Sequence, residues 1–232
     1  DTESKNSQGE RKMKAVILID NLTKGMLKKE RGLSVYIEHD GWKILLDTGA
    51  SGAFAENAEA LGISLEKVDA GVLSHAHYDH ADGMAEFFAR NAKAPFYLRK
   101  GAGEDCYTRK WIFHRYIGIH RGFLSRFRER MRYVEGKEEI LPGVFLLPHT
   151  APDLGEKGKK AGMYVRREGR WCPDCFDHEQ SLVLDAEKGI VIFNSCSHGG
   201  ADCIIREIQE AFPGKKIFAL IGGFHLYESS EE

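Results

Sequence analysis

The sequence predicts one α/β domain, and three observations support this. Strand-like and helix-like segments occur in both halves of the 232-residue chain, as in domains that layer helices on sheets. The sequence contains no internal repeat, low-complexity stretch or clear linker. Hydrophobic residues make up 42% and charged residues 29%, a balance typical of globular proteins with a sizeable core. We therefore expect residues 13–232 to form one domain, preceded at 1–12 by a leader or tag remnant.

Apolar runs and apolar/polar alternation predict the strands, which are bounded by turn residues such as those at 39–41. In chain order, strands are expected at 15–20, 33–38, 42–47, 68–74, 95–99, 144–147, 162–166, 181–185, 190–194 and 217–221. Helices are expected at 53–61, about 83–91 and about 201–211. Gly62 and Pro213 follow the first and last of these helices, where such residues commonly stop a helix.

The segment 104–135 differs in composition and is expected to be a basic helical insertion. Between Arg99 and Arg132 there are ten Lys or Arg and three acidic residues, a net charge of +7. Apolar residues recur here at three- and four-residue spacing, which is the pattern of an amphipathic helix. The segment is either a helix with a solvated basic face or a lid that attracts an anionic substrate such as a phosphate ester. The charge excess favours a role in binding.

The strongest functional signal is the run of histidines and aspartates at 75–82, where an expected strand gives way to a helix. In extended chain His75 and His77 project to the same side, so they can bind one metal ion together. Asp79 and His80 lie on the following turn and can face a second ion. Imidazole and carboxylate ligands suit zinc, iron or manganese. A polar loop without a ligand role is the alternative, but three histidines and two aspartates in eight residues disfavour it.

The spacing H-x-H-x-D-H resembles the signature of the metallo-β-lactamase superfamily. Leu46-Asp47-Thr48-Gly49 resembles that family's upstream Asp-Thr-Gly motif, whose aspartate supports the metal loop as an outer partner. A turn-initiating aspartate is the alternative for Asp47. The resemblance implies an αβ/βα sandwich, with two mixed sheets flanked by helices, and a site for two divalent transition-metal ions, zinc above iron or manganese.

Further segments resemble one branch of the superfamily, the synthases of a dihydropterin–ribofuranosylaminobenzene phosphate, which is a methanopterin precursor. These segments are Leu18-Ile19-Asp20-Asn21, Gly32-Leu33-Ser34, Asn194-Ser195-Cys196-Ser197-His198 and Gly222-Gly223-Phe224-His225-Leu226. The resemblance extends from about residue 15 to residue 228. A fold supports many activities, so it does not transfer the branch's named activity to this chain.

The resemblance also implies two sets of metal ligands. The first set is His75, His77 and His198, and the second set is Asp79, His80 and His225. His178 is the alternative to His198 as the third ligand of the first ion, and His198 is preferred. Cys196 stands where most of the superfamily has a bridging aspartate, and it is either a metal ligand that favours zinc or a small buried residue.

Two such ions would activate a water molecule, and Asp79 could receive its proton. We therefore expect a metal-dependent hydrolase acting on a small, anionic substrate: an ester, phosphate ester or lactone. A nuclease or phosphodiesterase of the same superfamily and a non-hydrolytic metal-binding or redox protein are the alternatives, and nucleic acid is a disfavoured partner. Five cysteines and no signal peptide favour the cytoplasm,, and the absence of a long apolar run argues against a membrane segment.

The spacing Cys172-Pro173-Asp174-Cys175 is found in zinc knuckles and redox motifs. A structural zinc site needs four ligands, and the sequence contains no second pair at this spacing. We therefore expect a hairpin tip with two free thiols. A zinc ion completed by another chain and a local disulfide are the alternatives.

Overall fold

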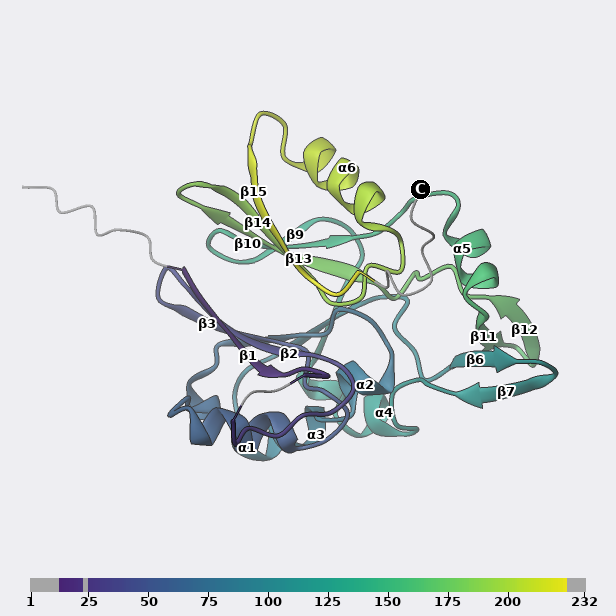
Figure 1. Cartoon of the computed structure of the whole chain (residues 1–232), viewed down its shortest axis with the longest axis horizontal. Coiled ribbons are helices and arrows are strands. Elements are labelled where there is room, and N and C mark those ends of the chain that lie inside the picture. The colour runs from purple at the N-terminus through teal and green to yellow at the C-terminus, as the bar shows by residue number, and fades with distance from the viewer. Residues whose placement is uncertain (1–12, 23–24, 225–232) are drawn as a thin grey trace, which may run out of the picture.

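Two β-sheets packed face to face form the centre of the chain in the computed structural model (Figure 1). The structure describes residues 13–22 and 25–224, so the expected leader at 1–12 and the expected ligand His225 lie outside the described residues. The first sheet has six strands in the order β1 (Met13–Ile19), β2 (Ser34–His39), β3 (Trp42–Leu46), β4 (Ala70–Val72), β5 (Phe96–Arg99) and β8 (Met131–Val134). The second has five strands in the order β15 (Ile217–Gly222), β14 (Gly189–Asn194), β13 (Gln180–Ala186), β10 (Val144–Pro148) and β9 (Glu138–Leu141).

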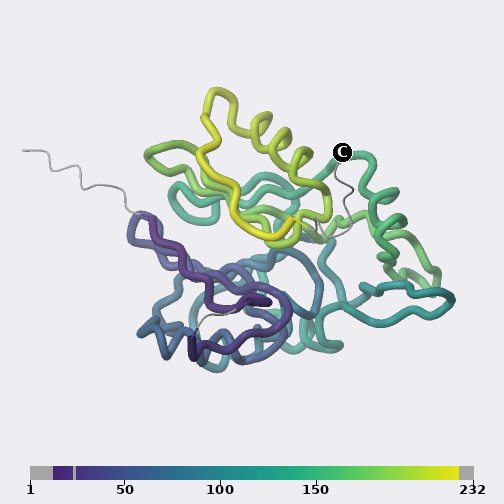
Figure 2. Tube along the Cα trace, viewed as in Figure 1, coloured from purple at the N-terminus to yellow at the C-terminus, as the bar shows by residue number. Residues whose placement is uncertain are grey.

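Both sheets are mixed, as expected. In the first, β1, β2 and β3 pair antiparallel, whereas β3, β4, β5 and β8 pair parallel. In the second, only β14 and β15 pair parallel. Figure 2 shows that the N-terminal half of the chain forms the layer around the first sheet and the C-terminal part the layer around the second.

Side chains that alternate along each strand build one core between the sheets and another on each outer face. Ile37 and Ile44 face the second sheet and meet Leu182 and Phe193. Leu45, the neighbour of Ile44, points the other way into the cluster under the helices. Strands buried on both faces read as continuous apolar runs, which is why the sequence revealed them.

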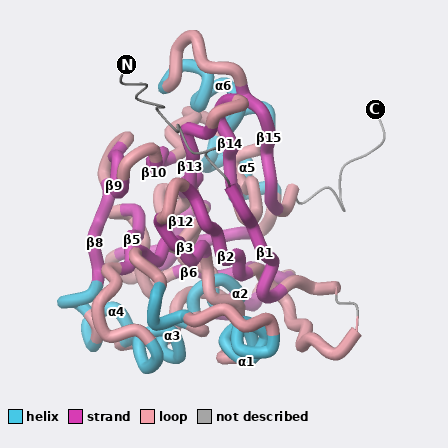
Figure 3. Tube along the Cα trace, turned by 90° about the vertical axis from the view of Figure 1, so that its left-hand side faces the viewer, coloured by secondary structure: helices cyan, strands magenta, loops and turns pink. Residues whose placement is uncertain are grey.

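Helices cover both outer faces, which completes the predicted sandwich (Figure 3). α1 (Ala53–Ala60) and α3 (Met84–Arg90) cover the first sheet, and α6 (Ala201–Ala211) covers the second. Ile204 and Ile208 of α6 pack on Ile192 of β14. None of the helices in the described part of the chain is long and apolar enough to cross a membrane.

The prediction of a helical insertion at 104–135 is wrong. The segment forms β6 (Cys106–Lys110), β7 (Phe113–Tyr116), the one-turn helix α4 (Phe123–Arg126), the 3₁₀ turn η2 (Arg128–Arg130) and most of β8. Trp111, with φ of +63°, reverses the chain between β6 and β7. Tyr107 and Tyr116 then pair across the two strands with ring centroids 5.2 Å apart, and such aromatic residues favour strands.

β6 and β7 join β11 (Met163–Arg167) and β12 (Arg170–Pro173) in a four-stranded sheet that we call the projecting sheet. It extends away from the sandwich at the right of Figure 1. The helical pattern misled because Phe113, which contributed to it, is 75% exposed. A helix that the sequence did not reveal, α5 (Leu154–Lys160), precedes β11 and contains two glycines. One of them, Gly158, lies so close to Asp174 that a Cβ atom would be 1.9 Å from its carbonyl oxygen.

Candidate metal centre

The histidine motif lies on the segment 73–82, which we call the metal loop and which follows β4 and includes the one-turn helix α2 (Tyr78–Ala81). His75, His77 and His80 are buried. The ring centroid of His75 lies 4.5 Å from that of His77 and 4.2 Å from that of His80. The end of β14 brings His198 to the same place, with its ring centroid 5.0 Å from those of His75 and His77. Four histidines from two sheets thus form one cluster.

Cys196 also faces this cluster. Its Sγ atom lies 3.3 Å from Nε2 of His80, and its sulfur and one nitrogen each of His75 and His198 lie within 4.8 Å of one another. A thiol that pointed into the core would make no such contacts. The geometry therefore fits the ligand interpretation of Cys196 better than the interpretation as a small buried residue.

Asp47 connects the end of β3 to the metal loop. It is fully buried, and its carboxylate accepts hydrogen bonds from the backbone amide of Ser74 at 2.7 Å, the hydroxyl of Ser74 at 2.6 Å and Nδ1 of His80 at 2.8 Å. Since the Ser74 hydroxyl donates to Asp47, it accepts from Nδ1 of His75 at 2.8 Å. These bonds place both imidazole protons on Nδ1, so Nε2 of His75 keeps a lone pair, as does Nε2 of His80 whenever that ring is neutral.

The cluster offers the kind of ligand atoms that bind transition metals. Nε2 of His75 is buried and has no hydrogen-bond partner within the described ranges, which is costly for a polar atom unless a ligand compensates it. Burial and the neighbouring imidazoles lower the pKa of His75 well below its usual value, which keeps the ring in its neutral form. Burial opposes protonation of His80 too, but Cys196 and Asp47 raise the pKa of this imidazole. His75 is thus in the form that binds zinc, iron or manganese, a neutral imidazole with an unpaired nitrogen,.

The geometry favours His198 over His178 as the third ligand of the first ion. The backbone amide of Ala76 donates to Nδ1 of His178 at 3.2 Å. A neutral His178 therefore carries its proton on Nε2, which donates to Asp174 at 3.0 Å, and no lone pair remains for a metal. His178 is also farther from the cluster, with its ring centroid 6.2 Å from that of His75.

Sequence reasoning missed two buried residues beside the site, Cys106 and Asp174. One ligand-type atom of each, together with one each of His77 and His178, lies within 4.8 Å of the others. Burial opposes ionisation of Asp174, but His178, His77 and a backbone amide lower the pKa of Asp174 to about 2. The spacing of Asp174 and His178, four residues apart, is the only signal in the sequence that pointed to this pair.

The expected hairpin tip at Cys172 and Cys175 is wrong. The hairpin turns at Glu168 and Gly169, both with positive φ, while Cys172 lies exposed on β12. Both thiols are free, as expected. Asp174, which stands between the two cysteines, carries the contact with the site.

The second set of ligands is only partly described. Asp79 lies at the start of α2 and is partly buried, but its carboxylate is not in any of the groups of ligand atoms that lie within 4.8 Å of one another in residues 13–22 and 25–224. The backbone of Asp79 lies close to Gly32, which has a φ of +109°: a Cβ atom on Gly32 would lie 1.6 Å from the Asp79 carbonyl oxygen. The ligand roles of all these residues, Asp79 and His225 included, stay predictions.

Comparison with known proteins agrees with this fold. The family model of the metallo-β-lactamase superfamily matches residues 28–162. The crystal structure of Tm1679, a metal-dependent hydrolase of the β-lactamase superfamily, is 32% identical, with a TM-score of 0.80 over 95% of this chain and 79% of that chain. An N-acyl homoserine lactone lactonase with 18% identity and a TM-score of 0.53, over 90% of this chain and 86% of that chain, is similar in fold alone.

A curated protein with a named activity is also similar. It is the 7,8-dihydropterin-6-methyl-4-(β-D-ribofuranosyl)-aminobenzene-5′-phosphate synthase of Methanocaldococcus jannaschii. The identity is 28% over 219 residues, which cover 88% of this chain and 73% of that protein.

Proposed function

The chain belongs to the metallo-β-lactamase superfamily, and from this premise we propose that it is a hydrolase with two divalent metal ions. Its substrate is a small, anionic ester, phosphate ester or lactone. One observation supports this most strongly: four imidazoles and one thiol converge, and the buried Nε2 of His75 has no hydrogen-bond partner among the described residues and offers a lone pair to a metal ion.

In this proposal the first ion is held by His75, His77 and His198, and the second by Asp79, His80 and His225. Cys196 takes the place of the bridging aspartate, and its soft sulfur favours zinc. When bound, two such ions activate a water molecule and polarise the carbonyl or phosphoryl oxygen of the substrate.

The remaining steps belong to the chain's own side chains. Asp47 orients His80 directly, and it orients His75 through the Ser74 hydroxyl. Asp79 receives the proton of the attacking water in this proposal. No serine nucleophile is required, since the water itself attacks.

In this proposal the substrate class includes phosphate esters, and the protein works in the cytoplasm. The relative from Methanocaldococcus jannaschii is named for a 5′-phosphate product, so phosphate esters belong in the substrate panel. Because that relative is a synthase, hydrolysis must be measured directly. None of the five cysteines, all of which the structure describes, forms a disulfide, which supports a reducing compartment such as the cytoplasm.

The test combines metal analysis with a panel of chromogenic esters, phosphate esters, phosphodiesters and lactones. We expect two equivalents of transition metal in the wild-type protein and hydrolysis of at least one substrate class. The His77→Ala variant should fold but lose more than about 100-fold of this turnover, because losing a ligand should cost at least as much as losing an outer-shell partner.

His114→Ala is the matched control, since this histidine stacks on Trp171 in the projecting sheet, outside the histidine cluster. It should keep both metal content and turnover. A wild-type protein that binds no transition metal after loading would contradict the proposal, and so would unchanged turnover in His77→Ala.

A further inference from the structure

A pocket of about 340 Å³ adjoins the metal loop. Its lining includes Tyr78, Asp82, Arg115, Tyr116, His120 and Arg121. Tyr78 and Asp82 are the residues on either side of the segment 79–81, which contains two of the expected metal ligands. The pocket volume is within the range of sites that bind small molecules.

Hydrogen bonds fix this pocket relative to the metal loop. The backbone amide of Tyr78 donates to the carbonyl oxygen of Ile117 at 2.8 Å, and His77 and Gly118 form an isolated β-bridge. The amide of His120 donates to the Asp82 carboxylate at 3.0 Å. The segment 117–120 is therefore attached at both of its ends to the loop that carries the histidines.

Two guanidinium groups give the pocket its charge. Among the residues that the structure describes, the guanidinium of Arg115 makes no hydrogen bond or ion pair. Arg121 donates to the Tyr107 hydroxyl at 2.8 Å and lies over the Tyr116 ring, 4.6 Å from its centroid. These contacts orient Arg121, and no carboxylate within residues 13–22 and 25–224 forms an ion pair with its guanidinium. Asp82 is the only acidic residue in the lining, and one of its oxygens accepts from His120.

We propose that this pocket binds the phosphate group of a phosphate monoester substrate, with Arg115 and Arg121 as its recognition residues. This inference rests on the proposed function, because it names the substrate class of the same site. Guanidinium groups bind phosphate through paired, charge-assisted hydrogen bonds. The rings of Tyr78 and Tyr116 offer an apolar wall for the organic part of the substrate.

The test measures calorimetric binding of two probes, ribose 5-phosphate and ribose, to the metal-loaded full chain. The probes differ only in the phosphate group. We expect the wild-type protein to bind ribose 5-phosphate more tightly than ribose. Arg115→Gln or Arg121→Gln should weaken the binding of ribose 5-phosphate by about 10-fold or more, as for loss of a hydrogen bond to a charged group. Binding of ribose should not change. Any contact of the phosphate with the metal ions contributes equally to the affinity of every variant, so it cancels when the variants are compared.

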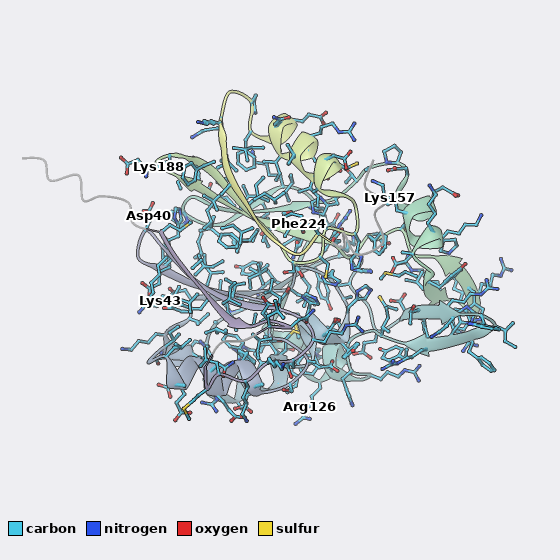
Figure 4. All side chains as sticks on the ribbon, viewed as in Figure 1. Asp40, Lys43, Arg126, Lys157, Lys188 and Phe224 are labelled. Carbon is cyan, nitrogen blue, oxygen red and sulfur yellow. The ribbon has the colours of Figure 1, made fainter. Side chains whose placement is uncertain are left out.

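Arg126→Gln is the matched control, because Arg126 lies over the Phe127 ring and is not part of the pocket lining. Figure 4 shows its side chain at the lower edge of the molecule. This variant should keep the full preference for phosphate. Thermal melting checks that each variant is folded, and Arg115→Gln, a substitution at an exposed position, keeps the test decisive if Arg121→Gln fails to fold.

The phosphate pocket is overturned if the Arg115→Gln/Arg121→Gln double variant keeps the wild-type preference for ribose 5-phosphate, or if Arg126→Gln loses it equally. These outcomes are separate from those of the proposed function. A protein that hydrolyses esters but keeps its phosphate preference in the double variant refutes only the pocket. A protein that loses the preference in the double variant, yet hydrolyses nothing, refutes only the hydrolase.

Discussion

The metal loop and the projecting sheet lie side by side in this molecule, but different forces hold them. In the metal loop, Asp47 is fully buried and its carboxylate accepts three hydrogen bonds, so backbone and side chains fix each other. In the projecting sheet, Trp111 and Phe113 are 84% and 75% exposed, and aromatic stacking such as that of His114 on Trp171 holds the surface.

This difference separates chemistry from recognition. A metal site needs its ligands held within tenths of an ångström, which a buried hydrogen-bond network can achieve. A surface that contacts a substrate can change its side chains with little cost in stability. In our proposals the reaction therefore depends on the metal loop, and the choice of substrate depends on residues at the base of the projecting sheet.

If the metal loop is the rigid region, the largest loss of stability should follow a substitution at Gly32. A Cβ atom there would lie 1.6 Å from the Asp79 carbonyl oxygen, and the φ of +109° is unfavourable for any other residue. We expect Gly32→Ala to lower the free energy of unfolding by about 3 kcal/mol or more, since strain and a backbone clash combine. Metal content should fall with it, because the clash displaces the loop that carries Asp79 and His80.

Gly62→Ala is the matched control, since Gly62 also has positive φ, +71°, but open space around it. Its cost should be about 1 kcal/mol from backbone strain alone, without loss of metal. Chemical denaturation and metal analysis measure both variants. Equal effects at the two glycines would show that the metal loop is not held by this close approach.

A smaller effect is expected at Asp174, where the projecting sheet meets the metal loop. Its two oxygens accept from Nε2 of His178 and from the amide of Phe176. The side chain of asparagine has one acceptor oxygen, so either the Phe176 amide or Nε2 of His178 would face the NH₂ group of the new side chain and lose its hydrogen bond. We expect Asp174→Asn to weaken metal affinity by about 10- to 100-fold, as other outer-shell substitutions do, because His178 holds the amide of Ala76 inside the metal loop.

A competition titration with a chelator measures this affinity. Asp153→Asn is the control, since the side chain of Asp153 is more than half exposed and, among the described residues, pairs with Lys157 on α5 and with none of the histidines. The metal affinity of this variant should match that of the wild-type protein. If Asp174→Asn binds metal as tightly as the wild-type protein, the Asp174–His178 pair does not position the loop.

The same contrast explains what could be predicted from the sequence. The apolar runs of β2 and β3 reveal buried strands, and the two-residue spacing of His75 and His77 places both rings on one side of an extended chain. Both signals are local in the sequence. The contact of Asp174 and Cys106 with His77 depends on how distant strands meet, and no local pattern encodes it. The segment 104–135 was misread because exposed Phe113 and the core residues Ile117, Leu124 and Phe127 happen to recur at helical spacing and imitate the apolar face of a helix,.

The smallest effect is expected at the tip of the projecting sheet. Trp111→Ser and Phe113→Ser should each change the free energy of unfolding by no more than about 0.5 kcal/mol, because both side chains are already in solvent,. Phe87→Ala is the contrasting variant: Phe87 is fully buried under the first sheet, and its loss should cost about 3–5 kcal/mol. Metal content should be unchanged in both tip variants. A tip variant that loses several kcal/mol would mean that the exposed aromatic residues are covered in solution, and the separation between a rigid reaction site and a tolerant recognition surface would then fail.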